Sequence, residues 1–187
     1  YALRYATMSP RTPHMNFLAP DPHDSAAQDL DYFVWLIRGG GGEILVDTGF
    51  NAEEASARAR KLTLNPVDAL ERFGVAASSV RDIIVTHLHY DHSGGNTLFK
   101  NARFIVQAAE WEYAGHPLPT QATYYQEFLI GREPLAYFRW QFVNGVTDIV
   151  PGVRVVPTPG HTPGHQSVAV DAKGTIFISD GGTSQQV

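Results

Sequence analysis

The hydrophobic pattern of this chain becomes regular from Tyr32 onward, where short apolar runs alternate with turn residues. Such runs, bounded by glycine or polar clusters, are typical of β-strands. They predict strands at 33–38, 43–47, 81–86, 103–107, 153–156, 167–170 and 175–179. Four consecutive glycines at 39–42 separate the first two runs, so we expect a hairpin there.

Helical signals fall between these strands. Residues 52–62 carry acidic residues early and basic residues late, as the helix dipole favours. Asn65 and Pro66 suit the start of a second helix, and Gly74 suits its end. A third, short helix is expected at 108–114. Helices lying between two strand-rich regions predict an α/β (α+β) fold with a largely mixed sheet.

The first 30 residues lack this regularity. Four prolines and no period at 9–24 predict an irregular but ordered N-terminal arm, with a disordered terminus as the alternative. Met15, Phe17 and Leu18 favour packing of the arm against the rest of the chain. With 43% hydrophobic and 18% charged residues, we expect residues 1–187 to form a single domain.

A second unusual segment is 124–142, which holds seven of the 21 aromatic residues. We expect a helix packed on the domain. The alternative is a hydrophobic wall for a substrate or the face of a homodimer.

Charge and hydropathy exclude several classes of partner. The net charge of −5 and pI of about 5.9 leave no chain-wide basic surface, so nucleic acid is not an expected partner. The apolar runs are far shorter than the roughly 20 residues that cross a bilayer, so no membrane association is expected. We therefore predict a small-molecule partner. The absence of cysteine fits a cytoplasmic location, and the start at Tyr1 leaves a processed N-terminus open.

The absence of cysteine also limits the chemistry. It excludes disulfides, thiolate-bound metals and a thiol nucleophile. A metal must then be held by His, Asp or Glu. Five of the eight histidines lie within the two short segments 87–92 and 161–165.

The first segment reads HLHYDH and follows a predicted strand. In an extended chain, His87 and His89 point to the same side, and a turn then brings Asp91 and His92 to a neighbouring position. One strand end can thus offer two ligands to each of two ions. By chance, this string is expected on the order of once in a thousand such chains.

Further candidates also follow predicted strands. His161 lies in a rigid Pro/Gly loop and is predicted to bind metal, whereas His165 is predicted to support the ligands. Asp180 ends a strand, where a carboxylate can bridge two cations or sit in a solvated turn. Asp47 also ends a strand, and we expect it to orient a histidine.

These residues resemble the metallo-β-lactamase superfamily over roughly residues 31–180. Segments 31–50, 83–110 and 150–168 are most similar to N-acyl homoserine lactonases, notably through TPGHTPGHQS at 158–167 and FIVQAAE at 104–110. The resemblance implies an αββα sandwich with the metal site at one edge of its two sheets.

The resemblance also implies a ligand set. One divalent ion is expected at His87, His89 and His161, and a second at Asp91 and His92 with Asp180 as the bridge. Zinc is the default metal, and iron, manganese or cobalt fit similar ligands. The family adds one histidine well after the bridging aspartate, so we expect the C-terminal part of the domain, with that ligand, to follow Val187. Thr183 occupies the position where family lactonases carry a tyrosine that polarises the substrate carbonyl.

The predicted function is a metal-dependent hydrolase. A metal-bound hydroxide would open the ester ring of a lactone such as an N-acyl homoserine lactone, as in quorum quenching, with Asp91 or Asp180 carrying a proton to the leaving alkoxide. Tyr90, Met15 and Phe17 are candidates, with Thr183, to line the substrate pocket.

Two alternatives stay open. The first is another hydrolase of this fold, acting on thioesters as glyoxalase II does, on β-lactams or on phosphodiesters. The second is an incomplete, non-catalytic metal-binding domain. Only the cysteine-ligated β-lactamases of the family are excluded.

Overall fold

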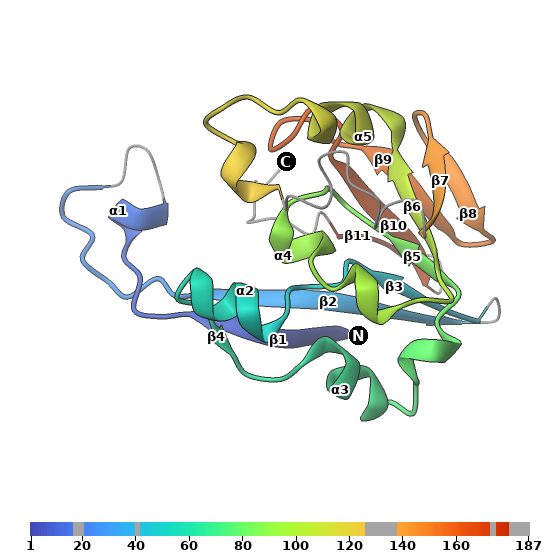
Figure 1. The fold of residues 1–187 in the computed structure, drawn as a ribbon, viewed down its shortest axis with the longest axis horizontal. Helices are drawn as coiled ribbons and strands as arrows, with labels where there is room; N and C mark the ends of the chain where they lie inside the picture. Colours follow the sequence, from blue (N-terminus) through green and yellow to red (C-terminus); the bar gives the residue numbers. More distant parts are fainter. Residues whose placement is uncertain (17–20, 40–41, 126–137, 173–174, 180–187) are drawn as a thin grey trace.

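The computed structural model describes the chain outside residues 17–20, 40–41, 126–137, 173–174 and 180–187. Two β-sheets face each other in this part, and helices pack on the outer face of the larger one (Figure 1). This mixed α/β architecture is the predicted fold class.

The larger sheet has seven strands in the order β4-β1-β2-β3-β5-β6-β7. Their bounds are β1 Ala2–Met8, β2 Leu30–Gly39, β3 Gly42–Val46, β4 Lys61–Leu62, β5 Asp82–Ile84, β6 Arg103–Gln107 and β7 Arg139–Val143. Pairing is antiparallel from β4 to β3 and parallel from β3 to β7. The sheet is therefore mixed, as predicted, and β2 and β3 form the predicted hairpin.

The smaller sheet is antiparallel, in the order β11-β10-β9-β8. Its strands are β8 Thr147–Val150, β9 Val153–Pro157, β10 Gln166–Ala172 and β11 Thr175–Ser179. Three of them match the predicted strands in this region.

Two hydrophobic cores cover the two faces of the larger sheet. Along β3, Ile44 and Val46 face the smaller sheet and pack in one cluster with Val155 and Val168. Leu45 points the other way, into the cluster that receives the helices. Because side chains alternate along a strand, each central strand contributes to both cores and is buried on both faces.

The helices are short. Their bounds are α1 Pro13–Asn16, α2 Ala52–Ala57, α3 Pro66–Glu71, α4 Tyr90–Ser93 and α5 Ala108–Gly115, with 3-10 turns at Ala77–Ser79, Asn96–Leu98 and Ala122–Tyr124. The predicted helix at 52–62 is wrong at its C-terminal end. Ala59 has a positive φ of 52°, which an α-helix does not allow, and Lys61–Leu62 pair with β1 instead.

Asn65 caps α3, because its side-chain oxygen accepts a hydrogen bond from the Val67 N–H at 2.9 Å. We expect Asn65→Ala to lower the free energy of unfolding by about 1 kcal/mol, since that N–H loses its partner. Asn65→Ser retains a capping oxygen and should restore most of the loss. Urea unfolding of the three proteins measures both effects, and equal midpoints for Ala and Asn would contradict the assignment.

The prediction of an irregular arm over residues 1–30 is wrong for residues 2–8, which form β1. A bulge between Arg4 and Ala6 breaks the alternation that identifies a strand, since Tyr5 and Ala6 are both buried. Farther along the arm, the short helix α1 lies at one end of the molecule (Figure 1).

The aromatic segment is also not helical throughout. Residues 139–143 form β7, which pairs in parallel with β6. Its burial follows no clean alternation, and Phe142 is exposed, so the pattern alone did not indicate a strand. Of the helix predicted within 124–142, residues 126–137 lie outside the described part.

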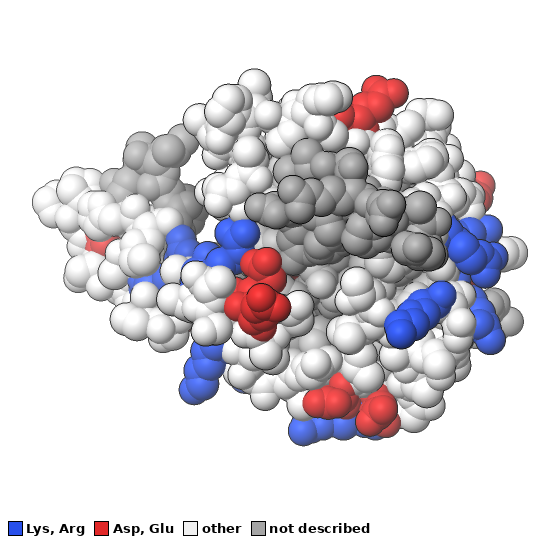
Figure 2. Space-filling model, viewed as in Figure 1, with Lys and Arg blue, Asp and Glu red and all other residues white. Residues whose placement is uncertain are grey.

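The surface view shows Lys and Arg in several separate places, with Asp and Glu among them (Figure 2). Among the described residues, no helix has the length and apolar character needed to cross a membrane.

Candidate metal centre

The candidate site forms where the carboxyl ends of two parallel strands meet. β3 is followed by Asp47, and β5 leads through residues 85–89 into α4. The loop between β9 and β10 arrives at the same edge, because the Gln166 N–H donates to the Thr86 carbonyl at 3.0 Å. The Gln166 side chain adds donors to the carbonyls of Val85 and Ile105. These hydrogen bonds hold the smaller sheet next to residues 87–92, which carry the histidines.

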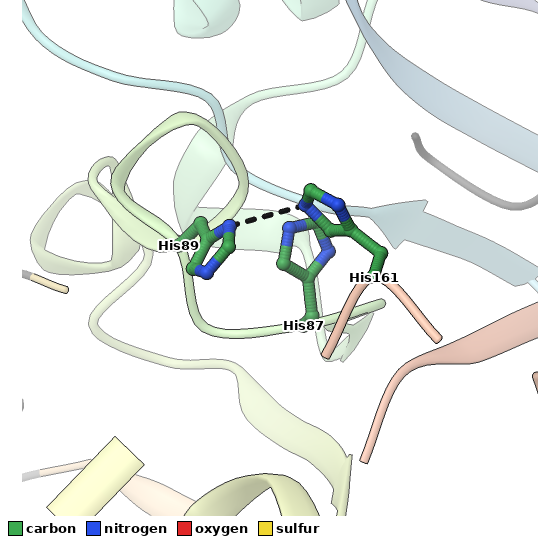
Figure 3. Close-up of side chains that lie close together, drawn as sticks. All are labelled: His87, His89 and His161. Carbon is green, nitrogen blue, oxygen red and sulfur yellow. Dashed lines mark hydrogen bonds between the residues drawn. The ribbon is translucent and has the colours of Figure 1, made fainter. Parts of the chain in front are cut away.

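Three histidines from these two loops converge (Figure 3). His87, His89 and His161 each offer one nitrogen, and the three nitrogens lie within 4.8 Å of one another. His89 Nδ1 and His161 Nε2 are 3.2 Å apart. His87 and His89 are buried, whereas His161 is exposed, so the group opens to solvent on the side of His161.

A second group overlaps the first. His87, Asp91 and His92 also offer ligand atoms within 4.8 Å of one another. The single turn of α4 brings Asp91 and His92 round to this position, as the sequence predicts. His92 Nε2 lies 3.5 Å from an Asp91 carboxylate oxygen. His87 is common to both groups, so the two candidate positions adjoin each other.

The donor atoms fit a divalent metal. His87 Nε2 and His89 Nε2 are both buried and have no hydrogen-bond partner among the described residues. Leaving a buried polar atom unpaired costs roughly 1–3 kcal/mol, and such atoms are rare in native proteins. Imidazole nitrogens with carboxylates are ligands that zinc and its neighbours accept. These buried nitrogens are therefore suited to hold a divalent metal ion.

The electrostatics of the cluster favour neutral histidines. Burial, followed by the neighbouring His92 and His89, lowers the pKa of His87 well below its ordinary value of 6.5. Burial and His161 lower the pKa of His89 to about 3. Because only a neutral imidazole binds metal, both rings stay competent well below neutral pH.

The same shifts predict an acid-sensitive fold. In the metal-free protein, the unfolded rings bind protons below about pH 6.5 while the folded rings do not. As the pH is lowered below 6.5, the free energy of unfolding should then decrease, by up to about 1.4 kcal/mol per pH unit for each ring. Urea unfolding with a chelator at pH 7 and 5.5 measures this. His89→Gln should show a shallower decline than the parent, and exposed His116→Gln the same decline. Equal declines in all three would contradict the shift.

Asp47 lies beneath the second group. Its carboxylate is fully buried and accepts hydrogen bonds from the Thr86 N–H at 2.7 Å and the Thr86 hydroxyl at 2.9 Å. The same carboxylate lies 2.7 Å from His92 Nδ1. Asp47 also has a positive φ of 61°, which is uncommon for a residue with a side chain. The contact with His92 is the one that Asp47 needs in order to orient a histidine, as predicted.

His165 lies at the back of the cluster. It is buried, and its Nδ1 lies 2.9 Å from the Thr158 hydroxyl. Its ring centroid is 5.2 Å from that of His87. These contacts place His165 beside the candidate ligands, and its supporting role stays a prediction.

Five further predicted site residues remain, three of them outside the described part and two on described elements. Asp180, Thr183 and Phe17 lie outside the described part. Met15 is exposed on α1, away from α4 in Figure 1. Tyr90 is buried in the larger core beside Phe50, with the Arg58 guanidinium 3.9 Å from its ring centre. Substrate contact by Tyr90 and Met15 stays a prediction.

Sequence reasoning missed Glu110, and it included Tyr124 and Tyr125 only as members of the aromatic segment, with a substrate wall as the alternative role. The rings of both tyrosines lie near His89, with centroids at 5.3 and 4.8 Å. Glu110 is fully buried and bonds to both histidine-bearing loops. The signal for Glu110 was weak, because an acidic residue in the first turn of a helix is ordinary.

Comparison with known proteins agrees with this geometry. The model of the metallo-beta-lactamase superfamily matches residues 28–183. An N-acyl homoserine lactonase from Bacillus sp is 35% identical over 159 residues, which are 78% of this chain and 60% of that protein. One from Bacillus thuringiensis is 33% identical over 167 residues, 81% of this chain and 63% of that protein. The chain thus spans about three fifths of these relatives.

Solved structures extend the likeness to the fold. A quorum-quenching N-acyl homoserine lactone lactonase is 31% identical, with a TM-score of 0.72 over 91% of this chain and 67% of its own. An N-acyl homoserine lactone hydrolase, solved with N-hexanoyl-L-homoserine at its catalytic metal centre, is 27% identical, with a TM-score of 0.74 over 95% and 72%. The predicted resemblance is confirmed, and this chain belongs to the metallo-β-lactamase superfamily.

Proposed function

We propose that this protein is a metal-dependent hydrolase that opens the ester ring of a lactone, with N-acyl homoserine lactones as the substrate class. The observation that carries the proposal is the pair of overlapping His/Asp groups at one sheet edge, with buried nitrogens that lack partners. The relatives that share this part of the chain are named N-acyl homoserine lactonases, which supports the substrate class.

Two divalent ions, with zinc as the default, would be held by these groups. His87, His89 and His161 would hold the first, and Asp91 and His92 the second, with Asp180 as the bridge. When bound, such ions supply Lewis acidity toward a carbonyl oxygen and lower the pKa of a coordinated water toward 7. The all-His/Asp donor set suits this chemistry.

The protein groups supply positioning and proton transfer. Asp47 fixes the orientation of His92 through its Nδ1 contact. Asp91 keeps about a fifth of its side chain exposed, so its carboxylate is accessible to carry a proton to the leaving alkoxide. Substrate would approach from the side of His161 and Tyr124, both exposed, where the tyrosine ring offers an apolar surface.

The test is a substrate panel with the purified full chain loaded with zinc. N-acyl homoserine lactones, a thioester, a β-lactam and a phosphodiester are compared, and ring opening is followed by the acid it releases. We expect zinc-dependent turnover of the lactones, abolished by a chelator and restored by zinc. Preference for another ester class would overturn the substrate assignment. Zinc binding without any turnover would instead favour a non-catalytic metal-binding domain.

A further inference from the structure

Glu110 is a fully buried acidic side chain beside the histidine-bearing loops. It lies in the first turn of α5 and has no exposed surface. Among the described residues, no Lys or Arg forms an ion pair with it. A buried carboxylate without a cation is costly unless hydrogen bonds compensate for its lost hydration. The hydrogen-bond partners of Glu110 must therefore compensate for the lost hydration of its carboxylate.

Those partners come from three segments. The Leu88 N–H donates to Oε1 at 2.9 Å, and the Tyr125 hydroxyl donates to the same oxygen at 3.3 Å. The Thr162 hydroxyl donates to Oε2. Leu88 stands between His87 and His89, and Thr162 directly follows His161. One carboxylate thus connects the two loops that carry the three histidines.

Gly164 shows how closely the second loop approaches. A Cβ at Gly164 would lie 2.0 Å from the Glu110 backbone nitrogen and 2.3 Å from its Cα. Only glycine permits this contact without moving one backbone, so the loop is held against the start of α5. The backbone contact and the Thr162 hydrogen bond fix the loop at two successive points.

We propose that Glu110 is a positioning residue of the metal centre, which holds His89 through Leu88 and His161 through Thr162 at the spacing that a shared ion requires. The proposal rests on the proposed metal site, but not on the identity of the substrate. The carboxylate suits this role because each oxygen accepts from a different loop. Glutamine would keep one acceptor, and Thr162 could turn its hydroxyl to accept from the amide.

The experiment measures Zn²⁺ affinity by competition with a chromophoric chelator, and Co²⁺ absorption spectra, in the full chain. For Glu110→Ala we expect affinity to fall about 10–100-fold and the Co²⁺ spectrum to change, as when ligands lose their supporting hydrogen bonds. Glu110→Gln should recover most of the affinity, with a loss below about tenfold. Glu112→Ala, an exposed change on the same helix, is the matched control and should match the parent.

Two results would overturn the proposal. One is a folded Glu110→Ala protein with the zinc affinity and Co²⁺ spectrum of the parent. The other is a parent that binds no zinc, which would remove the metal site itself and is recognised before any variant is made. If Glu110→Ala does not fold, Thr162→Val removes one hydrogen bond alone. It should weaken zinc binding and alter the Co²⁺ spectrum, and unchanged values would also count against Glu110.

Discussion

Replacing His87 or His89 with alanine is expected to abolish metal-dependent hydrolysis. Each ring contributes a buried nitrogen without another partner, and His87 belongs to both candidate groups. The loss in activity should exceed the roughly 10–100-fold typical when a residue that only supports a ligand is removed. Zinc content measured on the purified variants should fall together with turnover.

The same variants separate metal binding from folding. The Nε2 atoms removed have no partner among the described residues, and the Nδ1 atoms contact only the Thr86 hydroxyl and His161, so little that holds the fold is lost. Circular dichroism of the metal-free proteins should therefore match that of the parent. His116→Ala, which removes an exposed histidine, is the control and should retain full activity. Full activity in either buried variant would refute the proposed ligand set.

Replacing Asp47 should give the second large effect. Asp47→Ala removes the acceptor for the Thr86 N–H and hydroxyl and the partner of His92 Nδ1, all inside the protein. At 1–3 kcal/mol for an unsatisfied buried group, we expect a loss of about 3 kcal/mol in the free energy of unfolding. Zinc affinity should fall about 10–100-fold as His92 loses its orientation.

The Asp47→Asn variant separates the effect on zinc binding from the effect on stability. Asparagine tolerates the positive φ and can keep the Thr86 hydrogen bond, so most of the stability should remain. Its amide would face His92 Nδ1 with a donor, which forces the ring proton onto Nε2 and blocks that nitrogen as a ligand. We expect a folded protein with weakened zinc binding, measured by chelator competition. Asp82→Asn, which disturbs a partly exposed ion pair with Arg103, should bind zinc normally.

The candidate ligands could be predicted because their signal is local. HLHYDH places four donors in six residues at a strand end, and strand geometry alone sets their direction. Asp47 could be predicted for a related reason, since it directly follows a predicted strand. Neither inference needed knowledge of distant contacts.

Glu110 could not be predicted in this way. Its burial depends on Leu88 and Thr162, which lie 22 and 52 residues away in the sequence. The fold errors have the same origin. Residues 58–62 have a composition that suits a helix, but pairing of Lys61–Leu62 with β1 satisfies their backbone instead. Tertiary contacts thus overrode local preference.

The central claim is that the two His/Asp groups bind divalent metal. Anomalous diffraction at the zinc edge, from crystals of the zinc-loaded full chain, tests it most directly. We expect one peak among His87, His89 and His161 and a second beside Asp91 and His92. Zinc held only by other residues, such as His14, His23 or His116, or no peak at either group, would contradict it.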